Sequence, residues 1–270
     1  MGQTASAPKP GTQIQVIGAG LPRTGTTSFS SALAILLGSP VYHTGTQITA
    51  GPPAELKAWI RILRAWIDGD RRTVLSLLKS RLTGYAAITD TPGCQLVPEL
   101  LELYPDAKVI CTVRDSDAWE RSMTQAHSMT VLSFLKLLLL PLPGMRHFVD
   151  FTWLVRRLWS GRYAGSRRLN SVKEVRETLP TREIYTRHLA WLEEVVPADR
   201  LVMFDVREGW GPLCDALGIE VPPVNVPFPY ENDSVGIERT ARYHIRRALI
   251  WWAVIFAVAG VAITVVFRRR

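Results

Sequence analysis

The chain has 270 residues, of which 47% are hydrophobic and 21% are charged, which suits one sizeable globular domain with an additional apolar element and excludes disorder on a large scale. Its formal net charge of +8 comes from the C-terminal end, where seven arginines and no other charged residue follow Glu238. The rest of the chain is nearly neutral, which argues against a nucleic-acid partner.

The cysteines Cys94, Cys111 and Cys214 are widely spaced and form neither a CxxC pair nor a cluster with histidines. An odd number of isolated cysteines indicates a reducing compartment and no structural zinc site. We therefore expect no metal cofactor.

Residues 1–12 are rich in Pro, Ser, Thr and Gly, and this composition predicts a flexible N-terminal arm. The arm lacks the apolar core of a signal peptide, so secretion is not expected. Gly2 and Ser6 fit the pattern for N-terminal myristoylation, and the alternative is a plain, unmodified start. An acyl chain on Gly2 would bring the N-terminus to a membrane surface.

The first predicted unit is a strand, a loop and a helix. Residues 14–20 form a short apolar run that ends in glycine, typical of a buried parallel strand, and a helical period begins at Thr26 and stops at Gly38. Between them, Gly20 and Gly25 have the spacing of a phosphate-binding loop. In such a loop, backbone N–H groups and the helix N-terminus converge on an anion.

This loop differs from that of a nucleoside triphosphatase. Thr26 takes the place of the lysine, the cation Arg23 comes earlier, and no acidic residue clearly supplies the metal-holding position. Two other interpretations stay open, a plain loop-to-helix turn and a dinucleotide fingerprint that begins at Gly18. The fingerprint requires a glycine at Arg23 and an acidic residue near Val41–His43, and the sequence has neither.

The central part of the chain alternates between helical and strand patterns. Residues 55–83 look helical and carry apolar side chains on one face, so we expect them to cover the sheet. A helix is predicted over 98–104 and a strand over 108–113. The next helix begins near Asp117, where Glu120 has the register of a capping box.

Residues 131–142 are very apolar, but they contain Lys136 and are too short to span a membrane. They would line an acceptor pocket, touch a membrane surface or form an ordinary packed helix. A helix over 180–196, a strand over 200–204 and a helix over 210–217 follow. The alternation predicts an α/β fold with a mainly parallel sheet.

Residues 248–267 are uncharged over about 20 residues, the length that a helix needs to cross the hydrocarbon core of a bilayer. Trp251 and Trp252 near the start, and arginines at both ends, fit the two membrane boundaries. The alternative is a buried core helix, which would normally show a polar face or a shorter run. We expect a single transmembrane helix that inserts after synthesis, because only three residues follow it, and a body that stays in the cytosol.

Two segments resemble the donor-binding motifs of sulfotransferases. Residues 22–27 are similar to their 5′-phosphosulfate loop, usually Pro-Lys-Ser-Gly-Thr-Thr. Arg114 and Ser122 are similar to their 3′-phosphate motif, an arginine at a strand end and a serine eight positions later. The late Arg-Lys-Gly loop that clamps the 3′-phosphate in many cytosolic members is not evident. Further segments resemble the fungal-type branch of the family, sometimes mislabelled NAD-dependent epimerase/dehydratase: residues 104–109, 208–214 and 227–232.

This resemblance implies a P-loop three-layer sandwich over residues 13–238, followed by the transmembrane helix at 248–267. It also implies 3′-phosphoadenosine 5′-phosphosulfate as co-substrate and a hydroxyl or amine of a small molecule as acceptor. The residues that it assigns to the donor are Pro22, Arg23, Thr24, Gly25, Thr26, Thr27, Arg114 and Ser122.

Catalytic roles fall to few residues. Arg23 would stabilise charge on the leaving oxygen, and a base must accept the proton of the acceptor. In better-known members a histidine near the end of an early strand is the base, and Asp90 occupies the corresponding place here; its alternative role is to cap the turn before Pro92. His43, at the end of the segment Pro40–His43, is a second candidate base, and His188 on a predicted helix is a third.

Three functions remain open from the sequence. The first is a donor-dependent sulfotransferase, and the second is a P-loop protein of the same fold that has lost transfer and acts as a binding or scaffold module on a membrane. These two share every donor motif. The third is a nicotinamide-dependent oxidoreductase, which Arg23 disfavours because it stands where the fingerprint needs glycine.

Overall fold

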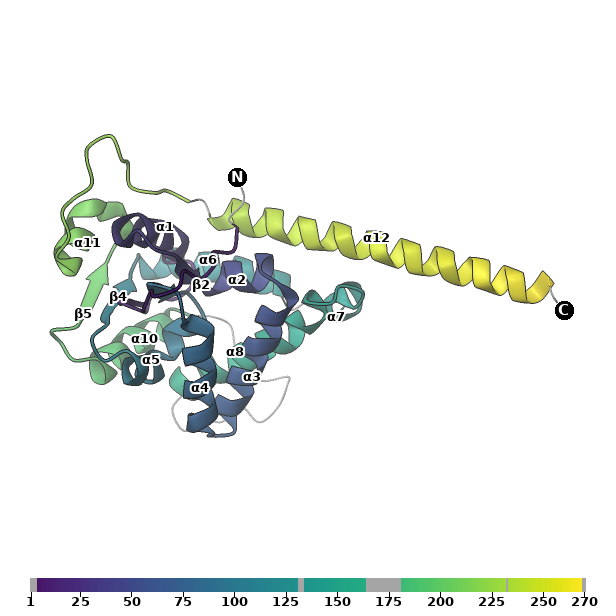
Figure 1. The fold of residues 1–270 in the computed structure, drawn as a ribbon, viewed down its shortest axis with the longest axis horizontal. Helices are drawn as coiled ribbons and strands as arrows, with labels where there is room; N and C mark the ends of the chain where they lie inside the picture. The colour runs from purple at the N-terminus through teal and green to yellow at the C-terminus, as the bar shows by residue number, and fades with distance from the viewer. Residues whose placement is uncertain (1–3, 131–133, 164–180, 232, 269–270) are drawn as a thin grey trace.

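The computed structural model describes residues 4–130, 134–163, 181–231 and 233–268, which form an α/β fold around a five-stranded sheet (Figure 1). All strand pairs are parallel, and the spatial order is β2-β3-β1-β4-β5. The predicted parallel sheet is confirmed. The strands are β1 (Val16–Gly18), β2 (Val41–His43), β3 (Ala87–Thr89), β4 (Lys108–Thr112) and β5 (Leu201–Phe204).

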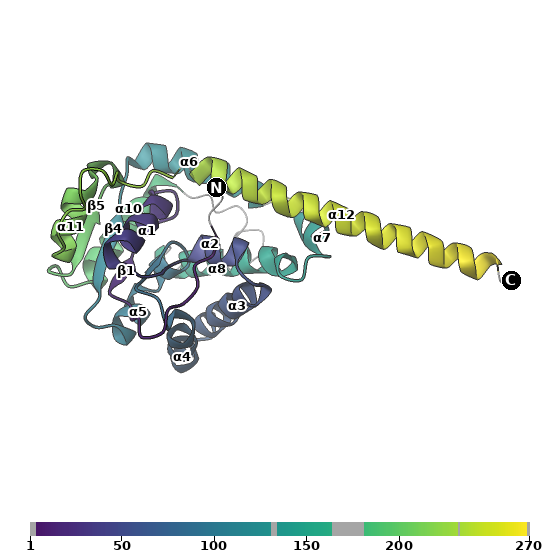
Figure 2. The same ribbon diagram turned by 45° about the horizontal axis from the view of Figure 1, so that its top comes forward.

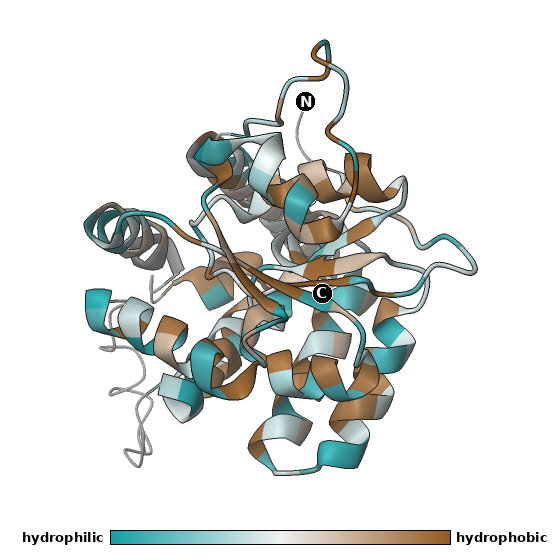
Figure 3. Ribbon diagram, turned by 90° about the vertical axis from the view of Figure 1, so that its left-hand side faces the viewer, coloured by the Kyte–Doolittle hydropathy of each residue, from teal (hydrophilic) through white to brown (hydrophobic). Residues whose placement is uncertain are grey.

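Helices cover both faces of the sheet, so the body has three layers, with apolar strands between them (Figure 3). Because side chains alternate across a strand, Val16 faces one helix layer and Ile17 faces the other. The layer beside Val16 consists of α1 (Thr26–Leu37) and α11 (Trp210–Leu217). The layer beside Ile17 consists of α3 (Pro53–Ile67), α4 (Arg71–Leu82), α5 (Val97–Leu103), α8 (Phe148–Tyr163) and α10 (Arg182–Val195).

The other elements connect these layers or leave the body. The helices are α2 (Thr44–Ala50), α6 (Ser116–Thr130), α7 (Leu135–Leu139) and α12 (Asp233–Arg268), and the short 3-10 turns are η1 (Gly93–Gln95), η2 (Met145–His147) and η3 (Val206–Glu208). The first three residues of the apolar run predicted at 131–142 lie outside the described residues. The run continues as α7.

The helical region predicted over 55–83 divides into α3 and α4. Asp70 stands between them, and its side chain accepts a hydrogen bond from the Thr73 N–H at 3.0 Å. This contact caps the first turn of α4 and satisfies an N–H group that has no partner within the helix.

The capping box predicted at Asp117 and Glu120 is wrong. The side chain of Asp115 accepts a hydrogen bond from the Ala118 N–H at 2.8 Å, so the cap of α6 lies two residues earlier. Asp117 instead forms an ion pair at 2.7 Å with Arg182 at the start of α10. Glu120 accepts a hydrogen bond from the Arg182 N–H at 3.3 Å, so Asp117 and Glu120 both contact the start of α10, which a local sequence pattern does not reveal.

The N-terminal arm, for which flexibility was expected, has a defined course from residue 4 onward. The Ser6 hydroxyl donates to the Val41 carbonyl oxygen at 2.6 Å, and the Gln47 side chain donates to the Ser6 carbonyl oxygen at 2.8 Å. The Tyr85 hydroxyl donates to the same carbonyl oxygen at 3.0 Å. Gly2 and the rest of residues 1–3 lie outside the described residues, so the myristoylation pattern stays a prediction.

The helix α12 is continuous and projects far beyond the body (Figures 1 and 2). Over Val235–Arg268 it is long and apolar enough to cross a membrane, and this range contains the predicted segment 248–267. Its first part contacts the body: His244 Nε2 donates to the Thr49 carbonyl oxygen at 2.8 Å, and Trp252 Nε1 donates to the Leu138 carbonyl oxygen at 3.2 Å. Beyond Trp252 the described side chains of α12 are exposed.

Candidate active site at the carboxyl edge of the sheet

The residues selected from the sequence gather at one edge of the sheet. The carboxyl ends of parallel strands lie at the same edge, and this edge is the usual ligand-binding side of open α/β sheets. The loop after β1 contains Arg23, β2 ends at His43, Asp90 follows β3, and Arg114 follows β4. Val206, which follows β5, completes the edge.

The loop after β1 is held against the ends of β4 and β5. A Cβ atom on Gly20 would lie 1.9 Å from the Thr112 hydroxyl, and a Cβ atom on Gly25 would lie 2.7 Å from a methyl group of Val206. Gly25 also has a φ of +89°, which glycine adopts without strain. Both glycines of the predicted loop frame are thus required by close approach of the backbone to its neighbours.

Thr24 is used to build the loop. Its hydroxyl donates to the Leu21 carbonyl oxygen at 2.7 Å, lies 2.5 Å from the Thr112 hydroxyl, and is buried. We therefore assign the Thr24 side chain a role in shaping the loop rather than in direct contact with a donor.

The loop leads into a helix N-terminus that suits an anion. The residue before α1 is Gly25, and within the described residues this helix has no capping side chain and no acidic residue in its first turn. The N–H groups of a first helical turn have no partners within the helix, and together with the helix dipole they favour a negatively charged ligand. Thr26 and Thr27 add two hydroxyl groups at the same place.

The predicted 5′ and 3′ motifs meet at Arg23. Its Nε atom donates to the Ser122 hydroxyl at 2.9 Å, and Arg114 Nη1 donates to the Arg23 carbonyl oxygen at 2.7 Å. Trp119 Nε1 donates to the Pro22 carbonyl oxygen at 2.9 Å. The structure therefore brings together two segments that lie about ninety residues apart in the sequence.

Two supporting residues of this group were not identified from the sequence. The Tyr185 hydroxyl, on α10, accepts from the Arg114 N–H at 3.0 Å and donates to the Arg114 carbonyl oxygen at 2.9 Å. Burial raises the pKa of Tyr185, so the phenol keeps the proton that it donates. Trp119 could have been identified from the sequence, because it lies three residues before Ser122 and hence on the same helix face. Tyr185 could not, because its partner Arg114 is distant in sequence.

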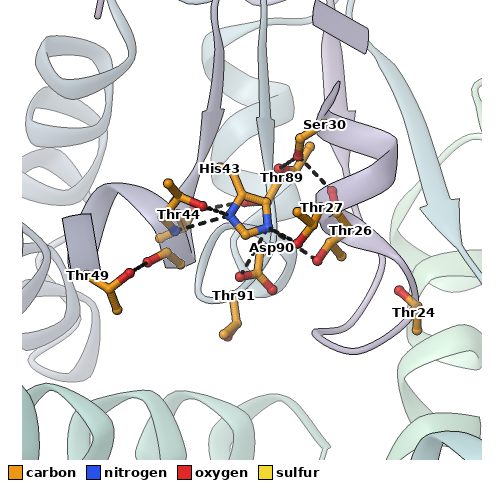
Figure 4. Close-up of polar contacts among 12 residues, drawn as sticks. Thr24, Thr26, Thr27, Ser30, His43, Thr44, Thr49, Thr89, Asp90 and Thr91 are labelled. Atoms are coloured by element: carbon orange, nitrogen blue, oxygen red, sulfur yellow. Dashed lines mark hydrogen bonds and ion pairs between the residues drawn. The ribbon is translucent and has the colours of Figure 1, made fainter. Parts of the chain in front are cut away.

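His43 and Asp90 form the second group (Figure 4). His43 Nε2 lies 3.7 Å from Asp90 Oδ2, 3.4 Å from the Thr26 hydroxyl and 3.5 Å from the Thr27 hydroxyl. The side chains of His43 and Asp90 are 13% and 10% exposed, so both are largely shielded yet reach the surface. The two candidate bases therefore face the first turn of α1 together.

A backbone hydrogen bond assigns the protons of His43. The Thr46 N–H donates to His43 Nδ1 at 3.1 Å, as part of the N-cap of α2. Because Nδ1 accepts this bond, the neutral ring carries its proton on Nε2, the atom that faces Asp90. In this state His43 presents an N–H at Nε2, and the carboxylate of Asp90 is the group able to accept a proton.

Backbone strain coincides with the site. Within the described residues, the residues other than glycine that have positive φ are Arg23 (+73°) and Asp90 (+71°). Such a conformation costs about 1 kcal/mol or more for a residue with a side chain, and it persists where the surroundings hold it in place.

His188 does not belong to this edge. It is fully buried, its Nε2 lies 2.7 Å from the Ala19 carbonyl oxygen, and its Nδ1 lies 2.7 Å from the Tyr163 hydroxyl. Burial lowers its pKa to about 4. Both ring nitrogens are occupied by buried partners, so we assign His188 a structural role. Within the described residues, no group of three or more His, Cys, Asp or Glu side chains is arranged to hold a metal ion.

Comparisons with known proteins match most of the chain. A family model described as a sulfotransferase domain matches residues 15–237. A protein of Aspergillus versicolor named Ava biosynthesis cluster protein M is 32% identical over 230 residues, which is 85% of each chain. The matched range of the family model includes all five strands, the loop after β1, and Arg114 with Ser122.

Proposed function

The chain belongs to the sulfotransferase domain family, and from that premise we propose that it transfers a sulfuryl group from 3′-phosphoadenosine 5′-phosphosulfate to a hydroxyl or amine of a small acceptor. The observation that carries this proposal is the position of Arg23, which contacts both Arg114 and Ser122. The loop that suits a 5′-phosphosulfate and the pair that suits a 3′-phosphate thus lie within one hydrogen bond of each other.

The residues present fit a donor with two anionic ends. The first turn of α1 would hold the 5′ end through backbone N–H groups and the hydroxyls of Thr26 and Thr27. Arg114 and Ser122 would hold the 3′-phosphate, since a planar guanidinium and a hydroxyl together supply several donors to phosphate oxygens. Arg23 lies between these groups, where it would stabilise charge on the leaving oxygen. The donor supplies the sulfuryl group, and no metal is needed in this arrangement.

We assign the base to Asp90 and a positioning role to His43. The N-cap bond from Thr46 keeps the His43 proton on Nε2, so the imidazole turns an N–H toward Asp90, with Nε2 3.7 Å from Oδ2. A carboxylate held in this way accepts the proton of an acceptor hydroxyl or amine as the acceptor oxygen or nitrogen attacks sulfur. His43 would orient the carboxylate between β3 and the first turn of α1.

We further propose that α12 anchors the chain in a membrane, with the body in the cytosol. The support is the long apolar exposed surface of α12, together with arginines at both ends of the predicted segment 248–267. A myristoyl group on Gly2 would add a second, weaker attachment, because a single acyl chain gives only marginal membrane binding.

The donor assignment is tested by the difference between two nucleotides. Arg114→Ala should weaken binding of 3′-phosphoadenosine 5′-phosphate by about tenfold to a hundredfold, the effect of losing charged hydrogen bonds. Binding of adenosine 5′-phosphate, which lacks the 3′-phosphate, should change little. Titration calorimetry of the full chain in detergent measures both.

Two further variants complete the test. Ser122→Ala should show the same preference with a smaller loss, and Arg61→Ala, an exposed arginine on α3, should change neither affinity. Equal losses for the two nucleotides in both Arg114→Ala and Ser122→Ala would show that these residues do not bind a 3′-phosphate.

A further inference from the structure

The short helix α7 carries apolar side chains on two opposite faces. Leu135 and Leu139 are buried in a cluster with Ala248 of α12. On the opposite face, Phe134, Leu137 and Leu140 are 57%, 63% and 48% exposed. We call these three side chains the α7 patch. Their spacing of three residues places them on one side of the helix.

Single exposed apolar residues are ordinary on protein surfaces, whereas a contiguous group of them marks a surface that meets another apolar phase. Folding of the body does not account for the α7 patch, because the buried face of α7 already supplies its packing. The patch therefore needs an occupant.

The position of α7 along α12 indicates which occupant. Trp252 Nε1 donates to the Leu138 carbonyl oxygen at 3.2 Å, and Ala248 is buried against α7. Figures 1 and 2 both show α7 beside the part of α12 that leaves the body. Trp252 is four residues into the apolar segment that starts at Ala248, which corresponds to about 6 Å along a helix axis. Helices that lie in a membrane interface bury their apolar face by about 5–10 Å. If the membrane begins at Ala248, α7 beside Trp252 would therefore lie at the depth of an interfacial helix.

We propose that the α7 patch inserts into the same membrane leaflet that α12 enters, so that the body rests on the bilayer at a fixed height. This inference depends on the proposed anchoring by α12. The surrounding charges suit it, because Arg246 and Arg247 directly precede the apolar segment, where their long side chains would reach lipid phosphates. Lys136, which is one turn before Leu140 and so borders the patch, is 60% exposed and pairs with Asp150 at 2.8 Å.

The helix α2 connects the candidate active site to α12. His43 caps the start of α2, and Thr49 near its end accepts the hydrogen bond from His244 of α12. Seven residues of α-helix span about 10 Å. The α7 patch and α12 together would therefore hold the edge that contains Asp90 at a set distance from the membrane surface.

Fluorescence quenching by spin-labelled lipids tests the proposal in the full chain. Leu137→Cys, labelled with an environment-sensitive fluorophore and reconstituted in phosphatidylcholine and phosphatidylserine vesicles, should lose emission when a nitroxide is placed near the lipid headgroups. Ile35→Cys on α1 is the matched control, because Ile35 is also apolar, helical and 48% exposed, and its label should keep its emission. The three native cysteines are buried, so the unsubstituted chain gives the labelling background.

A label on Val258→Cys separates this proposal from the anchoring on which it depends. Emission from Val258 should be lost with a nitroxide deep in the acyl chains. If Val258 is quenched while Leu137 behaves like Ile35, α12 spans the membrane and the α7 patch does not insert. If Val258 is not quenched by any lipid, both proposals are wrong. If the Leu137 label is unquenched by lipid but self-quenches as protein density rises, a second copy of the chain covers the patch and the proposal fails.

Discussion

Asp90 and His43 sit side by side, but the hydrogen bond at His43 Nδ1 gives them different chemistry. An imidazole that accepts a backbone N–H at Nδ1 cannot also offer a lone pair at Nε2 while neutral. Only a change of tautomer, at the cost of the α2 cap, would turn His43 into the base. The geometry therefore favours Asp90, whose carboxylate needs no rearrangement to accept a proton.

Asp90→Asn should lower transfer by about a hundredfold or more and leave donor affinity unchanged, because the amide has a similar shape and accepts no proton. His43→Asn keeps a side-chain acceptor for the Thr46 N–H and removes Nε2, so we expect a smaller loss, about tenfold. Donor consumption in the presence of small phenols and amines measures both. Near-normal transfer by Asp90→Asn, with no transfer by His43→Asn, would make His43 the base.

A substitution at Gly45 tests the position of the Asp90 carboxylate without changing Asp90 itself. A Cβ atom at this position would lie 2.6 Å from Asp90 Oδ2, so Gly45→Ala should push the carboxylate out of place. Transfer should fall by about tenfold to a hundredfold, as small displacements of catalytic groups do. Gly211→Ala on α11, where a Cβ atom meets nothing within 4 Å, is the control and should transfer normally. Normal transfer by Gly45→Ala would mean that the placement of Asp90 is unimportant.

For single residues, the sequence indicates which side chains are candidates for the site better than it indicates which side chains they contact. The glycine spacing of the loop, and the spacing between Arg114 and Ser122, are local patterns with a physical reason, and they identify the candidate site. The contact of Arg23 with Ser122, and the pairing of His43 with Asp90, depend on the order of strands in the sheet. That order arises from packing over the whole domain and leaves no local trace.

Among the elements, α10 links the core to the loop after β1. Its His188 Nε2 donates to the Ala19 carbonyl oxygen, one residue before Gly20, and its Tyr185 holds the backbone of Arg114 on both sides. One helix thus holds the backbone at the start of both proposed donor motifs. Because α10 lies in the layer opposite α1, it contacts the loop after β1 on the side away from the proposed donor.

This support has a pH dependence. The His188 pKa of about 4 in the folded chain lies below the ordinary value of about 6.5 expected after unfolding, so the unfolded chain binds a proton first as pH falls. Stability should therefore be full above about pH 6.5 and should fall toward pH 4, by on the order of 3 kcal/mol from this residue.

His188→Gln removes the titrating group and should flatten the dependence of the unfolding free energy on pH between 5 and 6.5. Urea unfolding of the full chain in detergent at several pH values measures this slope, which is independent of any constant loss of stability in the variant. An unchanged slope would show that His188 is not held neutral by the core.

The elements themselves were largely predictable, because strand and helix patterns are local and glycines such as Gly38 and Gly218 mark helix ends. The division between α3 and α4 and the cap of α6 were not. In both cases an aspartate could make several contacts, and the neighbouring elements determine which one forms: Asp70 caps a helix, and Asp117 pairs with Arg182.

For the whole molecule, the parallel sheet and the apolar C-terminal helix were predictable from alternation and run length. The arrangement of α12 was not, since its contacts with α2 and α7 join segments more than a hundred residues apart. These contacts unite the proposed membrane anchor and the candidate active site in one body. The family match covers that body up to residue 237 and so does not reach the apolar segment.

The central claim is that the edge of the sheet holds a phosphosulfate donor, and thermal unfolding with three nucleotides tests it most directly. The full chain in detergent should show a higher Tm with 3′-phosphoadenosine 5′-phosphate and with its phosphosulfate form, by several degrees at concentrations well above Kd, and no shift with NAD. Arg114→Ala should lose most of both shifts. Stabilisation by NAD, or by none of the three, would contradict the account.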